Sequence, residues 1–167
     1  ITPAKSTQSI LLNQLFTELS KTDNLKDADL LEKKIWAVWN KHPKNIILTD
    51  RLKFGTELMY EGSYNYDLKV FNNIIETDSK WSETWNKRAT LLFFMKDFKR
   101  SLEDIKIVLS IEPRHFGALS GQAQIYIELE EYEKAIDSLK KAQEIYPIIR
   151  TNNLILNLER LIKEQSI

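Results

Sequence analysis

The sequence predicts an all-α fold, an α-solenoid built from stacked helical hairpins. Three observations predict it: equivalent residues recur at a step of 34, apolar residues fall at helical spacing, and turn residues are scarce. Gly and Pro number only four each among the 167 residues, too few for the turns of a many-stranded β fold. A repeat of this length is typical of helix pairs, each of which buries its apolar stripe only by stacking on a neighbour.

The repeat step is visible by subtraction. Pro113 and Pro147 lie 34 residues apart, and each ends an apolar-periodic run. Aromatic residues recur at the same step, each opening the second helix of a predicted pair: Tyr64, Phe98 and Tyr132. Small residues recur likewise in the first helices, at Gly55, Ala89 and Ala123. Small side chains are expected there because two helix axes that cross closely leave no room for large ones.

These columns resemble the tetratricopeptide-repeat (TPR) pattern, in which a Trp, a small residue, an aromatic residue, an Ala and a Pro recur. The resemblance implies a right-handed solenoid with repeats at 82–115 and 116–149 and a degenerate repeat at 48–81. The degenerate copy carries Arg51 in the Trp column, Asp67 in the Ala column and Ser79 in the Pro column.

The two ends of the chain are expected to differ from the repeats. Residues 8–47 are predicted to form an irregular hairpin outside the strict register, with an apolar face made by Leu31, Ile35, Val38 and Trp39. Residues 150–165 carry an apolar stripe and predict a capping helix, which a solenoid needs to cover its last open core. The whole chain, 1–167, is therefore expected to be a single TPR-like domain.

A narrower resemblance covers most of the chain. The strings WNKRATLLFFMKDFKRSLEDI and EPRHFGALSG, with KKIWAVWNKHP before them, are similar to a family of small bacterial TPR proteins that carry a secretion signal. This resemblance implies a periplasmic or otherwise extracytoplasmic adaptor; a cytoplasmic location is the alternative. The chain begins at Ile1 rather than Met, which is compatible with a removed signal peptide.

Composition and motifs argue against several other classes of protein. Twenty-four Lys and Arg balance twenty-four Asp and Glu, so no basic field indicates a nucleic-acid partner. No apolar run reaches the length of about 18 residues needed to cross a bilayer. Cys is absent, and His42 and His115 lack the i, i+4 spacing of paired metal ligands. We expect His42 in an exposed loop and His115 near a helix start, and we expect no enzyme activity, cofactor or metal site.

The concave side of such a solenoid is lined by the first helices of the hairpins, so binding residues are predicted from register. The candidates in the two regular repeats are Asn86, Thr90, Phe93, Phe94, Ser120, Gln124, Ile127 and Glu128. The degenerate repeat adds Leu52, Thr56 and Met59. Amide and apolar side chains of this kind favour a peptide segment or a helix of another protein as the ligand. The Lys, Asn and Arg set with which some TPR domains grip acidic chaperone tails is not expected.

Two features leave a choice between interpretations. Trp36, Trp39 and Trp81 are the residues that would serve the competing hypothesis, a homo-oligomerisation module such as a homodimer. Gly121, a lone helix glycine, indicates close helix packing more than room for a ligand.

Two charged residues occupy apolar columns of the repeat. Asp67 replaces a buried Ala, and Arg88 replaces a buried Leu. Because an isolated buried ion is costly, Arg88 is expected to form a structural ion pair with Asp67 or Asp104. The alternative is that both charged heads reach solvent and never meet.

Overall fold

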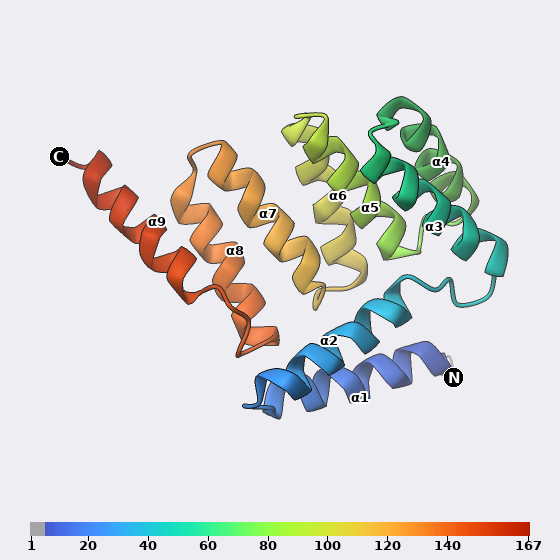
Figure 1. Cartoon of the computed structure of the whole chain (residues 1–167), viewed down its shortest axis with the longest axis horizontal. Helices are drawn as coiled ribbons and strands as arrows, with labels where there is room; N and C mark the ends of the chain where they lie inside the picture. Colours follow the sequence, from blue (N-terminus) through green and yellow to red (C-terminus); the bar gives the residue numbers. More distant parts are fainter. Residues whose placement is uncertain (1–5) are drawn as a thin grey trace.

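The computed structural model describes residues 6–167, and within them lie nine α-helices and no strand. Their bounds are α1 Thr7–Lys21, α2 Leu25–Trp39, α3 Ile46–Glu61, α4 Tyr64–Thr77, α5 Ser82–Phe94, α6 Phe98–Ile111, α7 Phe116–Glu128, α8 Tyr132–Ile145 and α9 Asn152–Gln165. The hairpins α3–α4, α5–α6 and α7–α8 follow one another in a row, with α9 after α8 (Figure 1). The predicted all-α class is confirmed, and the aromatic column falls on the starts of α4, α6 and α8.

The turn inside each of these three hairpins uses one residue with a left-handed backbone. Gly62, Lys96 and Glu130 have φ angles of 87°, 60° and 58°, and they are separated by the repeat step. In each turn the N–H of the next residue bonds to a carbonyl near the end of the first helix, which would otherwise lack a partner. Only the first turn has the glycine that this backbone conformation favours.

Close helix crossings explain the column of small residues. A Cβ atom added at Gly55 would lie only 2.8 Å from Cε1 of Phe71, and Ala89 and Ala123 are buried. At the far end, Ile155 of α9 is buried in one cluster with Ala123 and residues of α8. The helix α9 therefore caps the last hairpin, as predicted.

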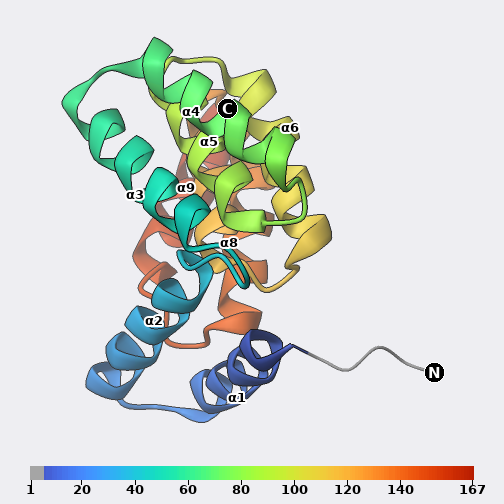
Figure 2. The same ribbon diagram turned by 90° about the vertical axis from the view of Figure 1, so that its right-hand side faces the viewer.

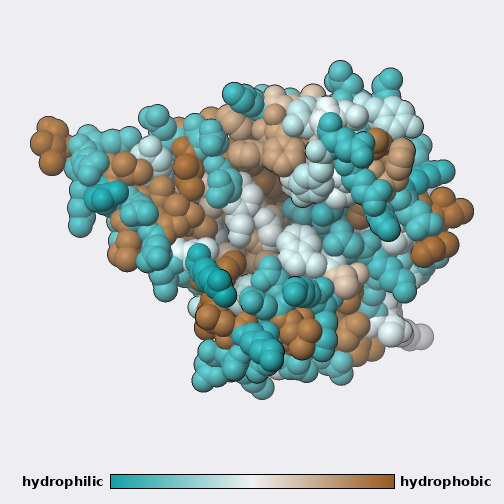
Figure 3. Space-filling model, viewed as in Figure 1, coloured by the Kyte–Doolittle hydropathy of each residue, from teal (hydrophilic) through white to brown (hydrophobic). Residues whose placement is uncertain are grey.

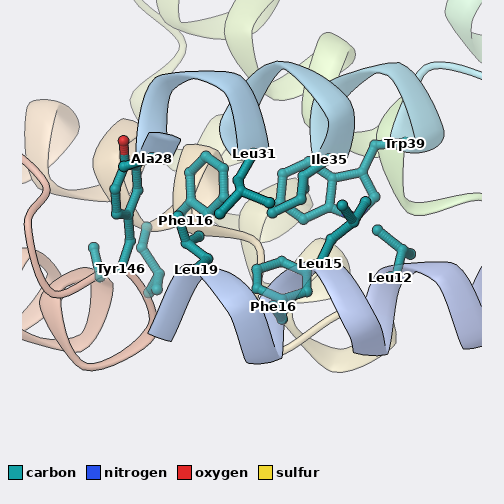
Figure 4. Packing of buried hydrophobic residues seen from close by; sticks show 12 residues of the cluster. Leu12, Leu15, Phe16, Leu19, Ala28, Leu31, Ile35, Trp39, Phe116 and Tyr146 are labelled. Carbon is teal, nitrogen blue, oxygen red and sulfur yellow. The ribbon is translucent and has the colours of Figure 1, made fainter. Parts of the chain in front are cut away.

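The N-terminal hairpin does not continue the row of hairpins. Figures 1 and 2 show α1 and α2 beneath the other helices. Their apolar faces join residues of α7 and α8 in one buried cluster (Figure 4): Leu12, Leu15, Phe16, Leu19, Ala28, Leu31, Ile35, Trp39, Phe116, Leu119, Ala142 and Tyr146. The apolar face predicted for residues 8–47 is thus buried, but against the last hairpin of the row and not the next one in sequence.

Polar contacts fasten the N-terminal hairpin to the same end of the row. The Tyr146 hydroxyl donates to Oε2 of Glu32 at 3.1 Å, and burial with the nearby Glu32 carboxylate raises the pKa of Tyr146 to about 12. The Arg114 guanidinium donates to Oδ1 of Asn13 at 2.9 Å and lies 4.4 Å from the ring centroid of Phe16. These contacts join segments about a hundred residues apart, beyond the reach of periodicity.

The tryptophans considered as an oligomer surface lie instead in the interior or beside it. Trp39 is 4% exposed and Trp81 is 6% exposed, and Nε1 of Trp81 donates to the Trp39 carbonyl at 3.0 Å. Trp36 is partly buried and packs against the same cluster. The assignment of these residues to a dimer interface is therefore wrong, because they hold the N-terminal hairpin in place.

The ion pair that Arg88 forms is with Asp104. Its Nε and Nη2 atoms donate to the two Asp104 oxygens at 2.7 and 2.8 Å, and Nη1 donates to Oδ1 of Asn72 at 2.9 Å. The side chain thereby ties α5 to α6 within its hairpin and to α4 of the preceding one. This two-bond geometry is the strong form of an arginine–carboxylate contact.

Asp67 takes no part in that pair, so the prediction of an Asp67–Arg88 ion pair is wrong. Its side chain is fully buried on α4, and neither carboxylate oxygen has a hydrogen-bond partner among the described residues. Burial, together with the nearby Glu61 charge, raises the pKa of Asp67. In the next repeat the same column holds Ser101, whose hydroxyl donates to the Ala89 carbonyl at 2.6 Å. We therefore expect Asp67 to destabilise the fold, because its column otherwise holds the small side chains of Ser101 and Ala135.

Candidate functional site

A cavity of about 260 Å³ lies between α5 and α7, with α6 forming its floor. Its lining residues come from these three helices: Asn86, Ala89, Thr90, Phe93, Phe94, Ser101, Ile105, Gly117, Gly121, Gln124 and Ile125. Figure 3 shows the molecule from the side of Figure 1, with pale and brown residues gathered over its middle between teal rims. Not one of the lining residues is ionisable, so the cavity suits an uncharged group.

The polar side chains of the lining are mostly satisfied within the protein. The Thr90 hydroxyl donates to the Asn86 carbonyl at 3.1 Å, and the Ser101 hydroxyl is bonded to the Ala89 carbonyl. Gln124 is exposed and forms no side-chain hydrogen bond with the described residues. A ligand would therefore meet carbon surface from Phe93 and Ile105 and one open amide at the rim.

The two glycines of α7 have different roles. A Cβ atom on Gly117 would lie 2.4 Å from Cη2 of Trp36, so this glycine is required by the N-terminal hairpin. At Gly121 the nearest atom to such a Cβ is Cδ1 of Ile105 at 3.8 Å, an ordinary contact. The prediction of close packing at Gly121 is therefore wrong, and its missing side chain leaves space in the cavity.

Asn86, expected to contact a ligand, is instead engaged in the interior. It is 8% exposed, and its Nδ2 donates to Oε1 of Glu83 at 3.2 Å. Glu83 is fully buried at the start of α5, and its other oxygen lies 2.9 Å from Nε2 of His115. Lys87 adds a contact of 3.3 Å to Glu83 Oε1. Asn86 thus lines the cavity while its amide supports a buried carboxylate.

His115 lies at the start of α7, as predicted, and is buried there. Its two ring nitrogens make different contacts. Nδ1 accepts the Ala118 N–H at 3.0 Å, so Nε2 is the ring nitrogen that donates to Glu83. The ring also stacks on Trp39, with centroids 3.9 Å apart. Burial opposes ionisation of Glu83, but the hydrogen bond from His115 and the charge of Lys87 lower the pKa of Glu83.

His42 uses the same arrangement elsewhere, and it too is buried where an exposed loop was expected. Its Nδ1 accepts the N–H groups of Lys44 and Asn45 at 3.1 and 2.9 Å, and Nε2 lies 2.8 Å from Oδ2 of Asp78. Burial opposes ionisation of Asp78, but its bonds to the Lys80 N–H and to His42 lower its pKa. Both histidines therefore join a helix start to a carboxylate: His115 joins α7 to Glu83 of the preceding hairpin, and His42 joins the start of α3 to Asp78 at the end of α4.

The predicted binding residues are divided by the structure. Asn86, Thr90, Phe93, Phe94 and Gln124 line the cavity. Ser120, Ile127 and Glu128 lie on α7 outside it, and Ile127 packs in the cluster beneath α9 instead. The candidates from α3 also change: Leu52 and Met59 are buried in the core, because α3 turns that face toward α4 and α5.

Sequence reasoning missed a second pocket, of about 480 Å³, which borders α5 at Lys87. It is lined by the end of α2, by α3 and by Lys87: Ala37, Asn40, Lys41, Ile46, Thr49, Leu52, Lys53, Thr56, Glu57 and Lys87. The repeat columns gave no signal for it, because Lys41 comes from the N-terminal hairpin. Only knowledge of where that hairpin packs brings these lysines together.

Neither a membrane span nor a metal site is found in the described part of the chain. Across residues 6–167 no helix is both long and apolar enough to cross a bilayer. The same residues include no group of three or more His, Asp or Glu side chains placed to hold an ion.

The chain is similar to known repeat proteins in sequence and in structure. The tetratricopeptide-repeat family model matches residues 117–148. A TPR repeat-containing protein of Rhizobium etli is 31% identical over 155 residues, which is 93% of this chain and 76% of the relative. Among solved structures, the first TPR domain of Spaghetti (RPAP3) bound to the HSP90 peptide SRMEEVD has a TM-score of 0.63 at 16% identity, over 66% of this chain and 89% of that one.

A second solved structure covers the chain more completely. The crystal structure of MamA protein has a TM-score of 0.60 at 17% identity, over 94% of this chain and 85% of that one. At such identities the solved structures show the shared fold alone. The repeat columns, the helix order and the Rhizobium etli relative together show that this chain belongs to the tetratricopeptide-repeat family.

Proposed function

We propose that the protein is an interaction scaffold that binds a polypeptide segment of another protein in the cavity between α5 and α7, without chemical turnover. The observation that carries the proposal is the chemistry of this cavity, which offers carbon surface and an open amide but no ionisable group. Such a lining fits an apolar side chain of a ligand whose backbone is held at the rim.

A protein with the same fold supplies a precedent for peptide binding. The TPR domain of Spaghetti, which shares the fold, was solved with a bound peptide. In the present chain Phe93 and Ile105 would contact the buried side chain of the ligand, and Gln124 would bond to its backbone. Asn86, in contrast, is assigned a structural role, because its amide already serves Glu83.

Gly121 provides the sharpest test. Gly121→Leu would fill the cavity, and the change suits a helix because Leu is a better helix former than Gly. Peptides selected from a random linear library on the wild-type protein are expected to bind this variant at least about thirtyfold more weakly, the loss of a central anchor worth about 2 kcal/mol. Fluorescence anisotropy of labelled peptides measures the change.

A matched control is available on the outer side of the hairpins. Lys106 is exposed on α6 and lines neither pocket, so Lys106→Ala should leave the affinity unchanged. Equal affinity of the wild type and both variants would contradict the proposal and place the selected peptides on another surface.

A second candidate function, self-association, is favoured by an apolar edge at the start of the row. Because the N-terminal hairpin lies elsewhere, the outer edge of α3–α4 leaves Phe54 47% exposed and Tyr66 56% exposed, with ring centroids 6.3 Å apart. Exposed apolar clusters often mark interfaces. Sedimentation of the wild type and of Phe54→Glu decides it: a dimer lost in the variant supports self-association, and a monomeric wild type rejects it.

The extracytoplasmic location implied by the sequence resemblance stays a prediction. Fractionation of cells that express the natural gene tests it.

A further inference from the structure

We infer that the pocket formed by Lys41, Lys53 and Lys87 takes an acidic side chain of the same polypeptide whose apolar side chain fills the cavity between α5 and α7. The inference rests on the function proposed above and adds a statement about the ligand: it carries an apolar anchor and a carboxylate at a fixed separation.

Charge complementarity carries the inference. The three lysines come from three separate elements, the end of the N-terminal hairpin, α3 and α5, and Glu57 is the one acidic residue among the lining residues. Lys41 and Lys53 are exposed and form no ion pair with any described residue. With Lys87 paired to Glu83 and Glu57 set against Lys41 and Lys53, the pocket keeps a net positive charge, in contrast to the chain as a whole, which is neutral.

Lys87 is the member of the set that the protein itself holds in position. Its side chain is 16% exposed, and its Nζ lies 3.3 Å from Oε1 of Glu83 and 5.7 Å from the centroid of a Trp36 ring. Glu83 also accepts from His115 and Asn86, so its charge is shared among three donors. An ammonium group has three N–H donors, so Lys87 can bind Glu83 and still donate to a ligand carboxylate.

From the repeat columns alone we expected no basic residues for an acidic ligand, because those columns hold Leu52 and Thr56 on α3. The lysine pocket lies outside these columns. The folded-back N-terminal hairpin adds Lys41 opposite Lys53, and register along the repeats could not show it.

Both pockets border α5, and the width of this helix limits the separation of the two ligand groups. Asn86 lines the cavity and the adjacent Lys87 lines the lysine pocket. Neighbouring residues of a helix point about 100° apart, so the two pockets lie on neighbouring sides of α5. A helix with its side chains is about 10 to 12 Å across. This distance corresponds to about three or four residues of an extended ligand, or to about seven residues, two turns, of a helical ligand.

Selection from the random linear peptide library on the full chain tests the inference. Enriched peptides are expected to carry a large apolar residue and an Asp or Glu at one of these spacings. Lys53→Glu and Lys41→Glu should each weaken the selected peptide about tenfold, because attraction becomes repulsion. Glu57→Gln should strengthen it, and Lys106→Glu on the outer side should leave it unchanged. Replacing the acidic residue of the peptide by its amide should abolish the effect of all these variants.

The outcomes separate the inference from the function on which it rests. Peptides that require the open Gly121 cavity but lack an acidic residue, or that are indifferent to Lys53→Glu and Lys41→Glu, overturn the inference and leave the scaffold function standing. Peptides indifferent to Gly121→Leu, or no enrichment at all, overturn the scaffold function and the inference with it. Weakening by the lysine reversals together with strengthening by Glu57→Gln supports both.

Discussion

Replacing His115 by Ala is expected to destabilise the fold strongly, because this ring completes three separate contacts. It accepts the Ala118 N–H at the start of α7, a helix cap worth about 1 kcal/mol. It donates to the fully buried Glu83 carboxylate, and a buried acceptor left short of a partner costs about 1 to 3 kcal/mol. It stacks on Trp39, which adds about 1 kcal/mol. Together the loss should be about 3 to 5 kcal/mol.

Thermal and urea denaturation followed by circular dichroism at neutral pH measure this loss. In a domain of this size 1 kcal/mol lowers the midpoint of thermal unfolding by about 2 to 4 °C, so a fall of about 10 °C is expected. The matched control is His42→Ala, which breaks the same kinds of bond. Its partner Asp78 has a side chain that is 33% exposed, so water can replace the lost donor, and the cost should be about half as large.

The loss of stability at acid pH gives an independent check on the role of His115. In the folded protein the pKa of Glu83 lies below its ordinary value of 4.5, so the folded state binds fewer protons than the unfolded state near that pH. The stability from this carboxylate is present above its ordinary pKa and is lost as the pH falls through the folded value. Without the His115 hydrogen bond the pKa is lowered less, so His115→Ala should show a shallower loss. A cost under about 1 kcal/mol, or an equal cost for His42→Ala, would refute the reasoning.

Three further predictions concern stability. Asp67→Ala should raise the free energy of unfolding by about 1 to 3 kcal/mol at neutral pH, because it removes two unpaired oxygens. Burial raises the Asp67 pKa, so the folded wild type binds a proton more readily than the unfolded chain and becomes more stable as the pH falls. The melting temperatures of the wild type and the variant should therefore converge at acid pH. Lys96→Gly should stabilise by about 0.5 to 1 kcal/mol and Gly62→Ala should destabilise by about 1 kcal/mol, since both sites have a positive φ; urea denaturation measures both, and changes of the same sign would contradict the account. Arg88→Met should cost about 3 kcal/mol, because it strands the buried Asp104; an unchanged melting temperature would show that the pair contributes nothing.

The features that sequence reasoning predicted well are those that repeat. The aromatic column at Tyr64, Phe98 and Tyr132 marks helix starts, and Gly55 stands where a Cβ would collide with Phe71. Each follows from local periodicity and from contacts between neighbouring hairpins, which recur with the same spacing. For Arg88 the sequence left two possible partners, Asp67 in the preceding helix and Asp104 in the following one, because residue spacing alone does not distinguish them.

The features it missed depend on a single, non-repeating contact. Nothing in residues 8–47 specifies that their apolar face packs on Phe116 and Tyr146, yet this placement buries Trp39, covers His115 and delivers Lys41 to the second pocket. Gly117, which lies against Trp36, was the one local sign, and its meaning is visible only when both segments are placed.

The candidate site was predicted in part, for the same reason. The repeat register placed Thr90, Phe93 and Gln124 on α5 and α7, the two helices that form the walls of the cavity, because the first helices of neighbouring hairpins face one another. The register did not show that the Asn86 amide donates to Glu83, because the sequence does not reveal whether a polar side chain bonds to water or to a buried carboxylate.

The measurement that tests the central claim most directly is amide chemical-shift mapping by NMR, with a selected peptide titrated into the isotope-labelled full chain. The account predicts that the largest shifts at low peptide concentration fall on Thr90, Phe93, Gly121 and Gln124, around the cavity between α5 and α7, and that Gly121→Leu abolishes them. Shifts confined to the outer helices α6 and α8, or to the exposed edge at Phe54 and Tyr66, would contradict it.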